Sequence, residues 1–293
     1  MKNKNMMVFG PESMLGSRLV ESLRKRGYQV FTCGRSTNFD VFLDLETGLN
    51  QNTFNNIDID CFFHCAASFG DDSWEGSVKN ERINALGSFH VAKLAVALKC
   101  RHLIYSGSIF SYLLNNFPIN SYGASKLRGE DILEWCLIRN NIKFTSLRFT
   151  QLYDEYGKCC LHQKWFGRIV AYAYNGKILR LPPGDARRNF LYIKDAVELM
   201  IIIAEKTITG RHPVTHPCSF TNKEIADYAY SVFNNGGSVE IAEEKKQFKE
   251  FYIPDSTKFY NNISWYPRFD IKKGLSIIRD IDTGGFFGPK DVC

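Results

Sequence analysis

Tyr122 and Lys126 are the residues whose types and spacing most directly suggest chemistry. They stand four residues apart in Tyr122-Gly-Ala-Ser-Lys126, so a helix would place a phenol and an ammonium on one face. A free tyrosine has a pKa of about 10 and is a poor base at neutral pH. A nearby ammonium is expected to stabilise the phenolate and lower that pKa. The pair could therefore move a proton to or from an alcohol or carbonyl oxygen.

A single Tyr-x3-Lys match can arise by chance, so the position of the pair in the chain must support the interpretation. A predicted strand over 102–106 ends in Ser106-Gly-Ser108, upstream of the tyrosine. Its hydroxyls would lie at the carboxyl edge of a sheet, where clefts of α/β proteins bind ligands. We assign Ser108 to hydrogen-bond the substrate oxygen, with Ser106 as the second choice. The alternative is that these serines merely end a strand.

A glycine-containing turn near the start of the chain is typical of a pyrophosphate site. In Gly10-Pro-Glu-Ser13-Met-Leu-Gly16, Gly10 permits a tight turn and Gly16 lets a helix pack against the sheet. Backbone N–H groups at the helix N-terminus would hold the phosphates. Ser13 stands where a glycine is usual and requires a negative φ. The predicted cofactor residues here are Gly10, Ser13, Met14, Leu15 and Gly16. The alternative is an ordinary strand-to-helix turn.

The second predicted strand ends in Cys33-Gly-Arg35-Ser36, which supplies a guanidinium and no acid. NAD enzymes usually carry an acid at this point for the ribose hydroxyls. An arginine instead matches a 2′-phosphate, so Arg35 favours NADP(H). The alternative is a solvated surface arginine. Asp44 and Leu45, which follow the next strand, are expected beside the adenine.

The elements that must position these residues alternate between strands and helices in the first half of the chain. This alternation predicts a parallel sheet with helices on both faces, a doubly wound α/β fold of the Rossmann type. The predicted strands are 6–9, 28–33, 39–43, 61–65, 102–106 and 144–149, and the predicted helices are 14–26, 77–99 and 122–140.

Beyond Phe149 the segments become irregular and rich in turns, which indicates a smaller, interleaved C-terminal lobe for the substrate. The expected cofactor domain covers 1–153 and also receives about 190–207. The expected substrate lobe comprises 154–189 and 208–293.

The composition is that of an ordinary soluble globule, with 44% hydrophobic and 23% charged residues. Nine scattered cysteines without framework spacing predict reduced thiols and a cytoplasmic protein. No metal is expected. The net charge of +6 is spread out, which suits an anionic small molecule better than nucleic acid. No apolar run reaches membrane-spanning length, so no membrane partner is expected.

Several segments together resemble the extended short-chain dehydrogenase/reductases, which include nucleotide-sugar epimerases, dehydratases and ketoreductases. The segments are the glycine turn, Cys65-Ala-Ala67, Asn84, Ser108, Tyr122-x3-Lys126, Leu147-Arg-Phe149, the 187–195 segment Arg-Arg-Asn-Phe-Leu-Tyr-Ile-Lys-Asp, and Ile263-Ser-Trp-Tyr-Pro267 followed by Lys273-Gly-Leu275. The resemblance covers nearly the whole chain. One departure is Asn189, where the family usually has aspartate.

This resemblance implies further site residues. Cys65, Ala66, Ala67 and Phe149 would line the cofactor, and Lys126 would also hold the nicotinamide ribose. Arg188 would contact the diphosphate of a nucleotide sugar. Tyr192 and Asp195 would mainly organise their own segment, which makes Tyr192 a weaker substrate candidate. The resemblance also implies a homodimer.

Two departures from the family pattern select among its activities. Ile109-Phe110 follows Ser108 where the sugar dehydratases carry an acid pair, so elimination of water is not expected. The short loop between Ser108 and Tyr122 resembles that of the CDP-paratose and CDP-abequose synthases. The resulting hypothesis is NADPH-dependent reduction of the 4-keto group of a nucleotide-linked 6-deoxy or 3,6-dideoxy sugar, in deoxysugar and lipopolysaccharide biosynthesis. The alternatives are a 4-epimerase that retains NAD and a non-catalytic nucleotide-sensing subunit.

Cys159, Cys160 and His162 form one more cluster that could do chemistry. A cysteine and a histidine can epimerise a carbon beside a ketone, but the matching cysteine after the serine motif is absent. His162 is kept as a substrate-binding candidate.

Overall fold

The computed structural model describes residues 4–49, 57–114, 117–118 and 120–287, and the chain divides into two units. Unit 1 contains 1–149 and 197–214, and unit 2 contains 150–196 and 215–293. The segment that returns to unit 1 is 197–214 in the structure, whereas the sequence predicted about 190–207. The assignment of cofactor to one unit and substrate to the other stays a prediction.

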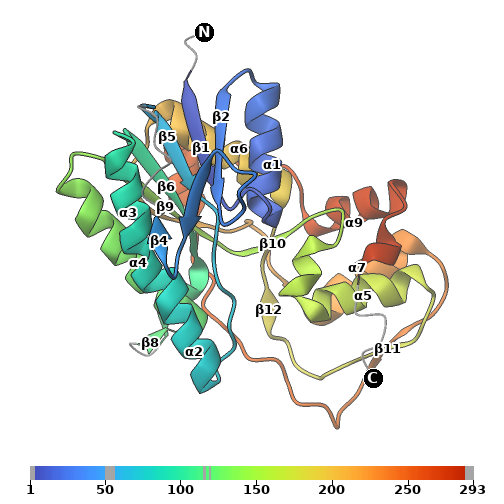
Figure 1. Ribbon diagram of the computed structural model, residues 1–293. Coiled ribbons are helices and arrows are strands. Elements are labelled where there is room, and N and C mark those ends of the chain that lie inside the picture. The colour runs from blue at the N-terminus through green and yellow to red at the C-terminus, as the bar shows by residue number, and fades with distance from the viewer. Residues whose placement is uncertain (1–3, 50–56, 115–116, 119, 288–293) are drawn as a thin grey trace. The chain divides into compact units, whose positions relative to one another are not determined.

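Seven parallel strands form the sheet of unit 1, and an antiparallel strand, β4, extends its edge (Figure 1). The order across the sheet is β14-β9-β6-β5-β1-β2-β3-β4. The strands are β1 (Asn5–Phe9), β2 (Gln29–Gly34), β3 (Val41–Asp44), β4 (Gly48–Leu49), β5 (Cys61–His64), β6 (His102–Ser108), β9 (Lys143–Phe149) and β14 (Gly210–Val214). The doubly wound α/β fold expected from the sequence is confirmed.

Helices cover the sheet because its strands are apolar on both faces, as in β5, where every residue is buried. Figure 1 shows α2, α3 and α4 together on one side of the sheet and α1 on the other. The bounds are α1 (Met14–Lys25), α2 (Trp74–Asn80), the π-helix η1 (Glu81–Leu86), α3 (Gly87–Ala97) and α4 (Ser121–Ile138). Helix α6 (Ile193–Lys206) runs from unit 2 into unit 1.

The structure alters two predicted elements close to the site. The helix expected over 77–99 begins at Trp74, because the Ser73 side chain accepts a hydrogen bond from the Gly76 N–H, and its middle turn is π-helical. The strand expected over 102–106 continues to Ser108, which pairs with Phe149 of β9. After β6 come η2 (Ile109–Ser111), β7 (Leu113–Leu114) and β8 (Phe117–Pro118). Part of the short loop before Tyr122, namely 115–116 and 119, lies outside the described residues.

Unit 2 consists of short two-stranded pairs and four helices. The paired strands are β10 (Gln151–Tyr153) with β13 (Phe190–Tyr192), β11 (Leu179–Leu181) with β16 (Val239–Ile241), and β12 (Arg187–Arg188) with β15 (Phe220–Thr221). The helices are α5 (Lys164–Tyr174), α7 (Asn222–Phe233), α8 (Thr257–Ile263) and α9 (Ile271–Asp280), with 3₁₀ turns η3 (Lys158–Leu161) and η4 (Gly284–Phe286). In neither unit do the described helices include one that is long and apolar enough to cross a membrane.

Candidate active site

The glycine turn after β1 is closed by Ser13. The Ser13 N–H and hydroxyl both donate to the Gly10 carbonyl, at 3.1 and 2.8 Å, and the Gly16 N–H donates to the Ser13 hydroxyl at 3.0 Å. Ser13 has φ −63°, the negative value that a serine at this position requires. Gly10 has φ +81°, and a Cβ there would lie 2.9 Å from the Ala66 nitrogen. A Cβ on Gly16 would lie 2.1 Å from the Gly10 carbonyl oxygen. The turn is therefore too tight for larger residues at either glycine.

The start of α1 offers donors to an anion. Within the described part of the chain, the N–H groups of Met14 and Leu15 have no acceptor. Helix N-termini leave such donors free, and the aligned peptide dipoles favour negative charge there. The turn fits a dinucleotide pyrophosphate.

The predicted adenosine-side residues follow β2 and β3. Arg35 is exposed and forms no ion pair with any described residue. Asp44 Oδ1 accepts hydrogen bonds from Glu46 and Thr47, at 2.7 and 3.3 Å, so this carboxylate also holds its own turn. Leu45 is buried against Gly87 of α3. Of the three predicted residues, Arg35 thus has a charged group that makes no ion pair with a described residue.

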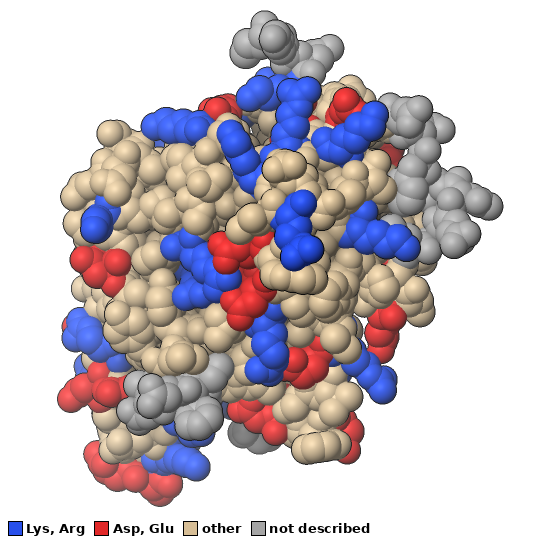
Figure 2. Space-filling view, turned by 90° about the vertical axis from the view of Figure 1, so that its left-hand side faces the viewer, with Lys and Arg blue, Asp and Glu red and all other residues tan. Residues whose placement is uncertain are grey.

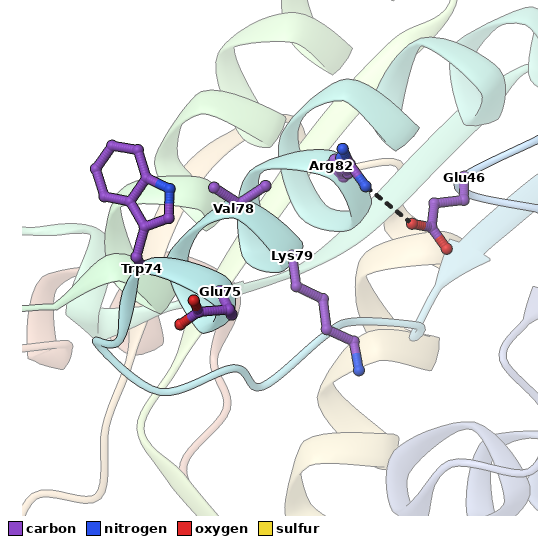
Figure 3. A pocket seen from close by; sticks show the side chains of 6 residues that line it. All are labelled: Glu46, Trp74, Glu75, Val78, Lys79 and Arg82. Atoms are coloured by element: carbon purple, nitrogen blue, oxygen red, sulfur yellow. Dashed lines mark ion pairs between the residues drawn. The ribbon is translucent and has the colours of Figure 1, made fainter.

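A hollow of about 390 Å³ lies on the outer side of α2, near the turn that follows Asp44. Figure 3 shows its lining, with Arg82 and Glu46 paired across it at 4.0 Å. The other lining residues are Trp74, Glu75, Val78 and Lys79. None of the predicted catalytic residues belongs to it.

The 65–73 loop, which follows β5, lies next to the glycine turn. The Cys65 N–H donates to the Phe9 carbonyl at 2.9 Å, and Ala66 packs on Gly10. Burial raises the pKa of the Cys65 thiol to about 12, so the thiol stays neutral. Ala67 is half-buried at the same edge of the sheet. The side chains at this edge are thus small and neutral.

Two asparagines one helical turn apart fasten the 65–73 loop to α4. Asn84 accepts from the Ser68 N–H (2.8 Å) and donates to the Ser68 carbonyl (2.9 Å) and the Ser125 hydroxyl (3.0 Å). Asn80 makes the same three bonds, at 2.8, 3.0 and 3.0 Å, to the Gly70 N–H, the Gly70 carbonyl and the Ser121 hydroxyl. Asn84 lies in the π-helical turn, a feature often found at functional sites. The sequence analysis did not identify Asn80, although two asparagines at i and i+4 were a visible signal.

Tyr122 and Lys126 lie in the first two turns of α4, as predicted. Tyr122 is half-buried, and its ring stacks on Phe69 at a centroid distance of 4.7 Å. Burial raises the pKa of the Tyr122 phenol. The expectation of a lowered pKa is therefore wrong for the chain alone, because burial removes the phenolate from water. At neutral pH the phenol therefore carries its proton, and its donation requires a group that stabilises the phenolate left behind.

Lys126 is only 1% exposed, and its Nζ lies 3.9 Å from the centroid of the Tyr105 ring. Burial lowers the pKa of Lys126 to about 7, against the opposing influence of Glu130 and Cys65. No carboxylate of the described residues forms an ion pair with this ammonium. At neutral pH the Lys126 side chain is therefore divided between its charged and its neutral form.

The serines of β6 meet the first turn of α4. Ser108 is buried, and its hydroxyl accepts from the Phe110 N–H at 3.2 Å, which begins η2. A Cβ on Gly123 would lie 2.1 Å from the Phe110 carbonyl oxygen, so η2 packs directly beside Tyr122. Ser106 is half-buried two residues earlier.

Phe149 is buried at the end of β9, opposite Ser108 in the sheet. The carboxyl ends of β6 and β9 therefore meet beside α4. The described residues give no direct bond between Ser108 and Tyr122.

A buried carboxylate, Glu130, anchors α4 to the sheet. It is 0% exposed and accepts from the Ser146 hydroxyl (2.7 Å), Arg148 Nη2 (2.7 Å) and Arg211 Nε (2.9 Å). These partners belong to β9 and β14. Sequence reasoning missed Glu130, although it stands four residues after Lys126 on the same helical face.

Arg188 in unit 2 is a buried cation that forms no close ion pair with a described carboxylate, although the charge of Glu250 acts on it. It is 5% exposed and lies among aromatic rings, with centroids at 5.1 Å (Phe251), 5.4 Å (Phe248) and 6.0 Å (Trp165). Its Nη1 donates to the Lys249 carbonyl at 2.9 Å. A desolvated guanidinium of this kind favours an anionic ligand.

The neighbours of Arg188 have structural roles. Asn189 Nδ2 donates to the His216 carbonyl (2.7 Å), and Asn189 Oδ1 accepts from the His216 N–H (2.8 Å). Tyr192 is fully buried against Tyr153 and Phe269, a position typical of core packing. Asp195 accepts from two backbone N–H groups, at residues 268 and 269.

The thiol of Cys159 is not an activated nucleophile. Its sulfur lies 4.0 Å from that of Cys160, and the contact with Cys160 together with burial raises the pKa of Cys159. His162 is exposed after η3. The described residues contain no group of three or more metal-ligating side chains.

Comparison with known proteins finds relatives in both sequence and fold. Residues 6–215 match the model of the NAD dependent epimerase/dehydratase family. CDP-abequose synthase of Salmonella muenchen is 23% identical over 291 residues, which cover 93% of this chain and 96% of that protein. UDP-glucuronic acid decarboxylase 1 of Arabidopsis thaliana is 23% identical over 304 residues, covering 94% and 68%. The crystal structure of UDP-N-acetylglucosamine 4-epimerase from Bacillus cereus shares the fold, with a TM-score of 0.78, 21% identity and 99% of each chain covered.

Proposed function

Because the chain belongs to the NAD dependent epimerase/dehydratase family, we propose that it is an NADPH-dependent reductase of a nucleotide-linked sugar. The reacting group is the 4-keto group of a 6-deoxy or 3,6-dideoxy sugar, and Tyr122 donates the proton. The observation that carries this proposal is the placement of the half-buried Tyr122 one helical turn before the buried Lys126 at the start of α4.

The mechanism assigns one task to each side chain. A bound nicotinamide cofactor would supply hydride to the carbonyl carbon. The Tyr122 hydroxyl gives its proton to the carbonyl oxygen as charge develops there. Ser108 donates a hydrogen bond to the same oxygen, and Lys126, in its protonated form, stabilises the phenolate that remains and holds the nicotinamide ribose. Asn84, through Ser125 and the 65–73 loop, keeps α4 in place during the transfer.

The preference for NADP(H) rests on Arg35. This residue is exposed, uncommitted and follows directly after β2, where NAD enzymes usually carry an acid. Gly10, Ser13 and Gly16, with the free N–H groups of Met14 and Leu15, would hold the pyrophosphate. Asp44, Cys65, Ala66 and Phe149 complete the proposed cofactor contacts.

The substrate is a nucleotide diphosphate sugar whose phosphates bind Arg188. The buried, aromatic-lined guanidinium supports this, as does the similarity to CDP-abequose synthase over nearly the full length of both chains. Similarity to decarboxylases and epimerases is equally present, so the choice of reduction rests on Arg35 and on the missing elimination acid after Ser108.

A cytoplasmic homodimer is part of the proposal. All eight cysteines in the described part of the chain are free, which supports a reducing compartment. Apolar side chains are exposed at the end of η1 and on α3 and α4, and Figure 2 shows uncharged areas on this side of the molecule. The exposed residues are Leu86, Phe89, Val96, Trp135 and Ile138. A second copy of the chain would cover them.

The test is a panel of CDP-, dTDP-, GDP- and UDP-linked 4-keto-6-deoxy sugars with NADPH, followed by absorbance and product NMR. The expected result is stoichiometric consumption of NADPH by a protein that purifies largely free of cofactor. Tyr122→Phe should reduce turnover by about 10²–10⁴ with little change in cofactor affinity.

The competing functions give different results. Tightly bound NAD and interconversion of 4-epimers without NADPH consumption would establish the epimerase instead. Binding of nucleotide sugars without any turnover would establish the sensing subunit.

A further inference from the structure

The ring of Phe69 lies directly beside the proton donor of the proposed reaction. It stacks on the Tyr122 ring with centroids 4.7 Å apart and planes 18° from parallel. Phe69 is nevertheless 50% exposed. Its ring therefore presents apolar surface next to the atom that delivers the proton.

The position of Phe69 is fixed on both sides. Asn84 binds the backbone of Ser68, and Asn80 binds the backbone of Gly70, so the residues before and after Phe69 are each held by paired hydrogen bonds. The same loop is tied to α4 at Ser121, whose hydroxyl donates to the Asp71 carbonyl at 2.9 Å. The backbone that carries the ring is therefore held in place, and the ring itself stacks on Tyr122, so it can contribute to substrate selection.

The charges of the 65–73 loop also affect which substrates can bind beside Tyr122. Asp71 and Asp72 follow Phe69 closely, both are exposed, and the loop contains no lysine or arginine. The Ser73 hydroxyl and N–H hold the pKa of the Asp71 carboxyl below its usual value, so this acid is ionised at neutral pH. The surface beside Tyr122 is thus apolar at Phe69 and negative next to it, which disfavours an anionic substituent.

We propose that Phe69 determines specificity at carbon 6 of the sugar, favouring a methyl group over a hydroxymethyl group and excluding a carboxylate. This rests on the proposed function, in which Tyr122 protonates the oxygen on carbon 4. Carbon 6 is attached to carbon 5, the immediate neighbour of carbon 4, so its substituent lies within reach of a ring that stacks on Tyr122. A hydroxymethyl group packed against this ring would lose water contacts without a replacement partner.

The test uses three nucleotide sugars that differ only at carbon 6, namely UDP-6-deoxyglucose, UDP-glucose and UDP-glucuronic acid. Their dissociation constants are measured by calorimetry in saturating NADP⁺, and no turnover is needed. Wild-type protein should bind the 6-deoxy sugar about tenfold more tightly than the glucose compound, and the glucuronic acid compound most weakly. Phe69→Ala should bring the first ratio within about threefold of one, and Phe69→Leu should retain part of it.

Phe286→Ala is the matched control, because Phe286 is an exposed phenylalanine of η4 in unit 2, and it should leave the ratio unchanged. Equal affinities of the wild type for all three sugars, or an unchanged ratio in both Phe69 variants, would overturn the proposal. Failure of the reductase is recognised separately, by the absence of NADPH consumption with every keto sugar, and it does not affect this ratio.

Discussion

Replacement of the buried lysine, Lys126, by methionine should stabilise the fold and remove the activity. The ammonium of Lys126 is 1% exposed, and burial lowers its pKa from 10.5 to about 7. At a pH of about 7.5 the folded chain must give up a proton that the unfolded chain keeps, which costs about 4 kcal/mol at about 1.4 kcal/mol per pKa unit. Methionine has a similar length and no charge, but it loses the contact with the Tyr105 ring, worth about 0.5–2 kcal/mol. The net stabilisation expected is about 2–3 kcal/mol.

The stability difference should depend on pH in a defined direction. Since the folded pKa of Lys126 lies below the unfolded value, the unfolded chain binds more protons between about pH 7 and pH 10.5. Wild-type stability therefore gains up to about 1.4 kcal/mol per pH unit in this window from Lys126, and the methionine variant lacks that gain. Below about pH 7 the lysine is charged in both states, so the difference is constant there. The advantage of Lys126→Met should be largest near neutral pH and shrink as the pH rises.

Thermal unfolding followed by circular dichroism between about pH 6.5 and 9.5 measures this difference. A gain of about 2–3 kcal/mol corresponds to roughly 5 °C in the transition of unit 1 near neutral pH. Lys93→Met is the matched control, because Lys93 is an exposed lysine of α3, and it should change the transition little. If Lys126→Met lowers the transition temperature, or raises it equally at every pH, the buried charge does not oppose folding and the reasoning fails.

Three further substitutions test other parts of the site. Arg35→Ala should weaken NADPH binding at least about tenfold, the loss of charge-assisted bonds to a 2′-phosphate, and leave NADH binding nearly unchanged in calorimetry; equal losses for both would remove Arg35 from that phosphate. Gly16→Ala places a Cβ 2.1 Å from the Gly10 carbonyl oxygen, so it should destabilise the protein by about 1–3 kcal/mol and weaken NADPH binding; an unchanged melting temperature and affinity would contradict the tight turn. Glu130→Gln leaves the arginine partners of Glu130 without their buried anion and should cost about 3 kcal/mol in urea unfolding; a loss below about 1 kcal/mol would show that the network does not anchor α4.

Much of the fold could be predicted from the sequence, because its signals are local. The glycine turn, the Tyr122-x3-Lys126 spacing and the alternation of strands and helices each depend on residues within about one element. The sequence also predicted a negative φ at Ser13, and the structure confirms it at −63°. The long helix before β6 was recognised, but its π-helical turn was not, since that turn is stabilised by bonds from Asn84 to residues far along the chain.

The tertiary structure alone decided how the site residues are surrounded. Phe69 meets Tyr122, and Asn80 meets Ser121, only because the 65–73 loop and α2 pack against the start of α4, and no spacing in the chain predicts such pairs. The direction in which the Tyr122 pKa shifts could not be predicted from the sequence either. The sequence showed the ammonium at i+4, but the burial of the phenol depends on the residues that pack around it. By itself the sequence determined which groups are present and which share a helical face. Only the tertiary structure determined which of these groups are buried, which are paired and which are in contact, because those properties arise between residues distant in sequence.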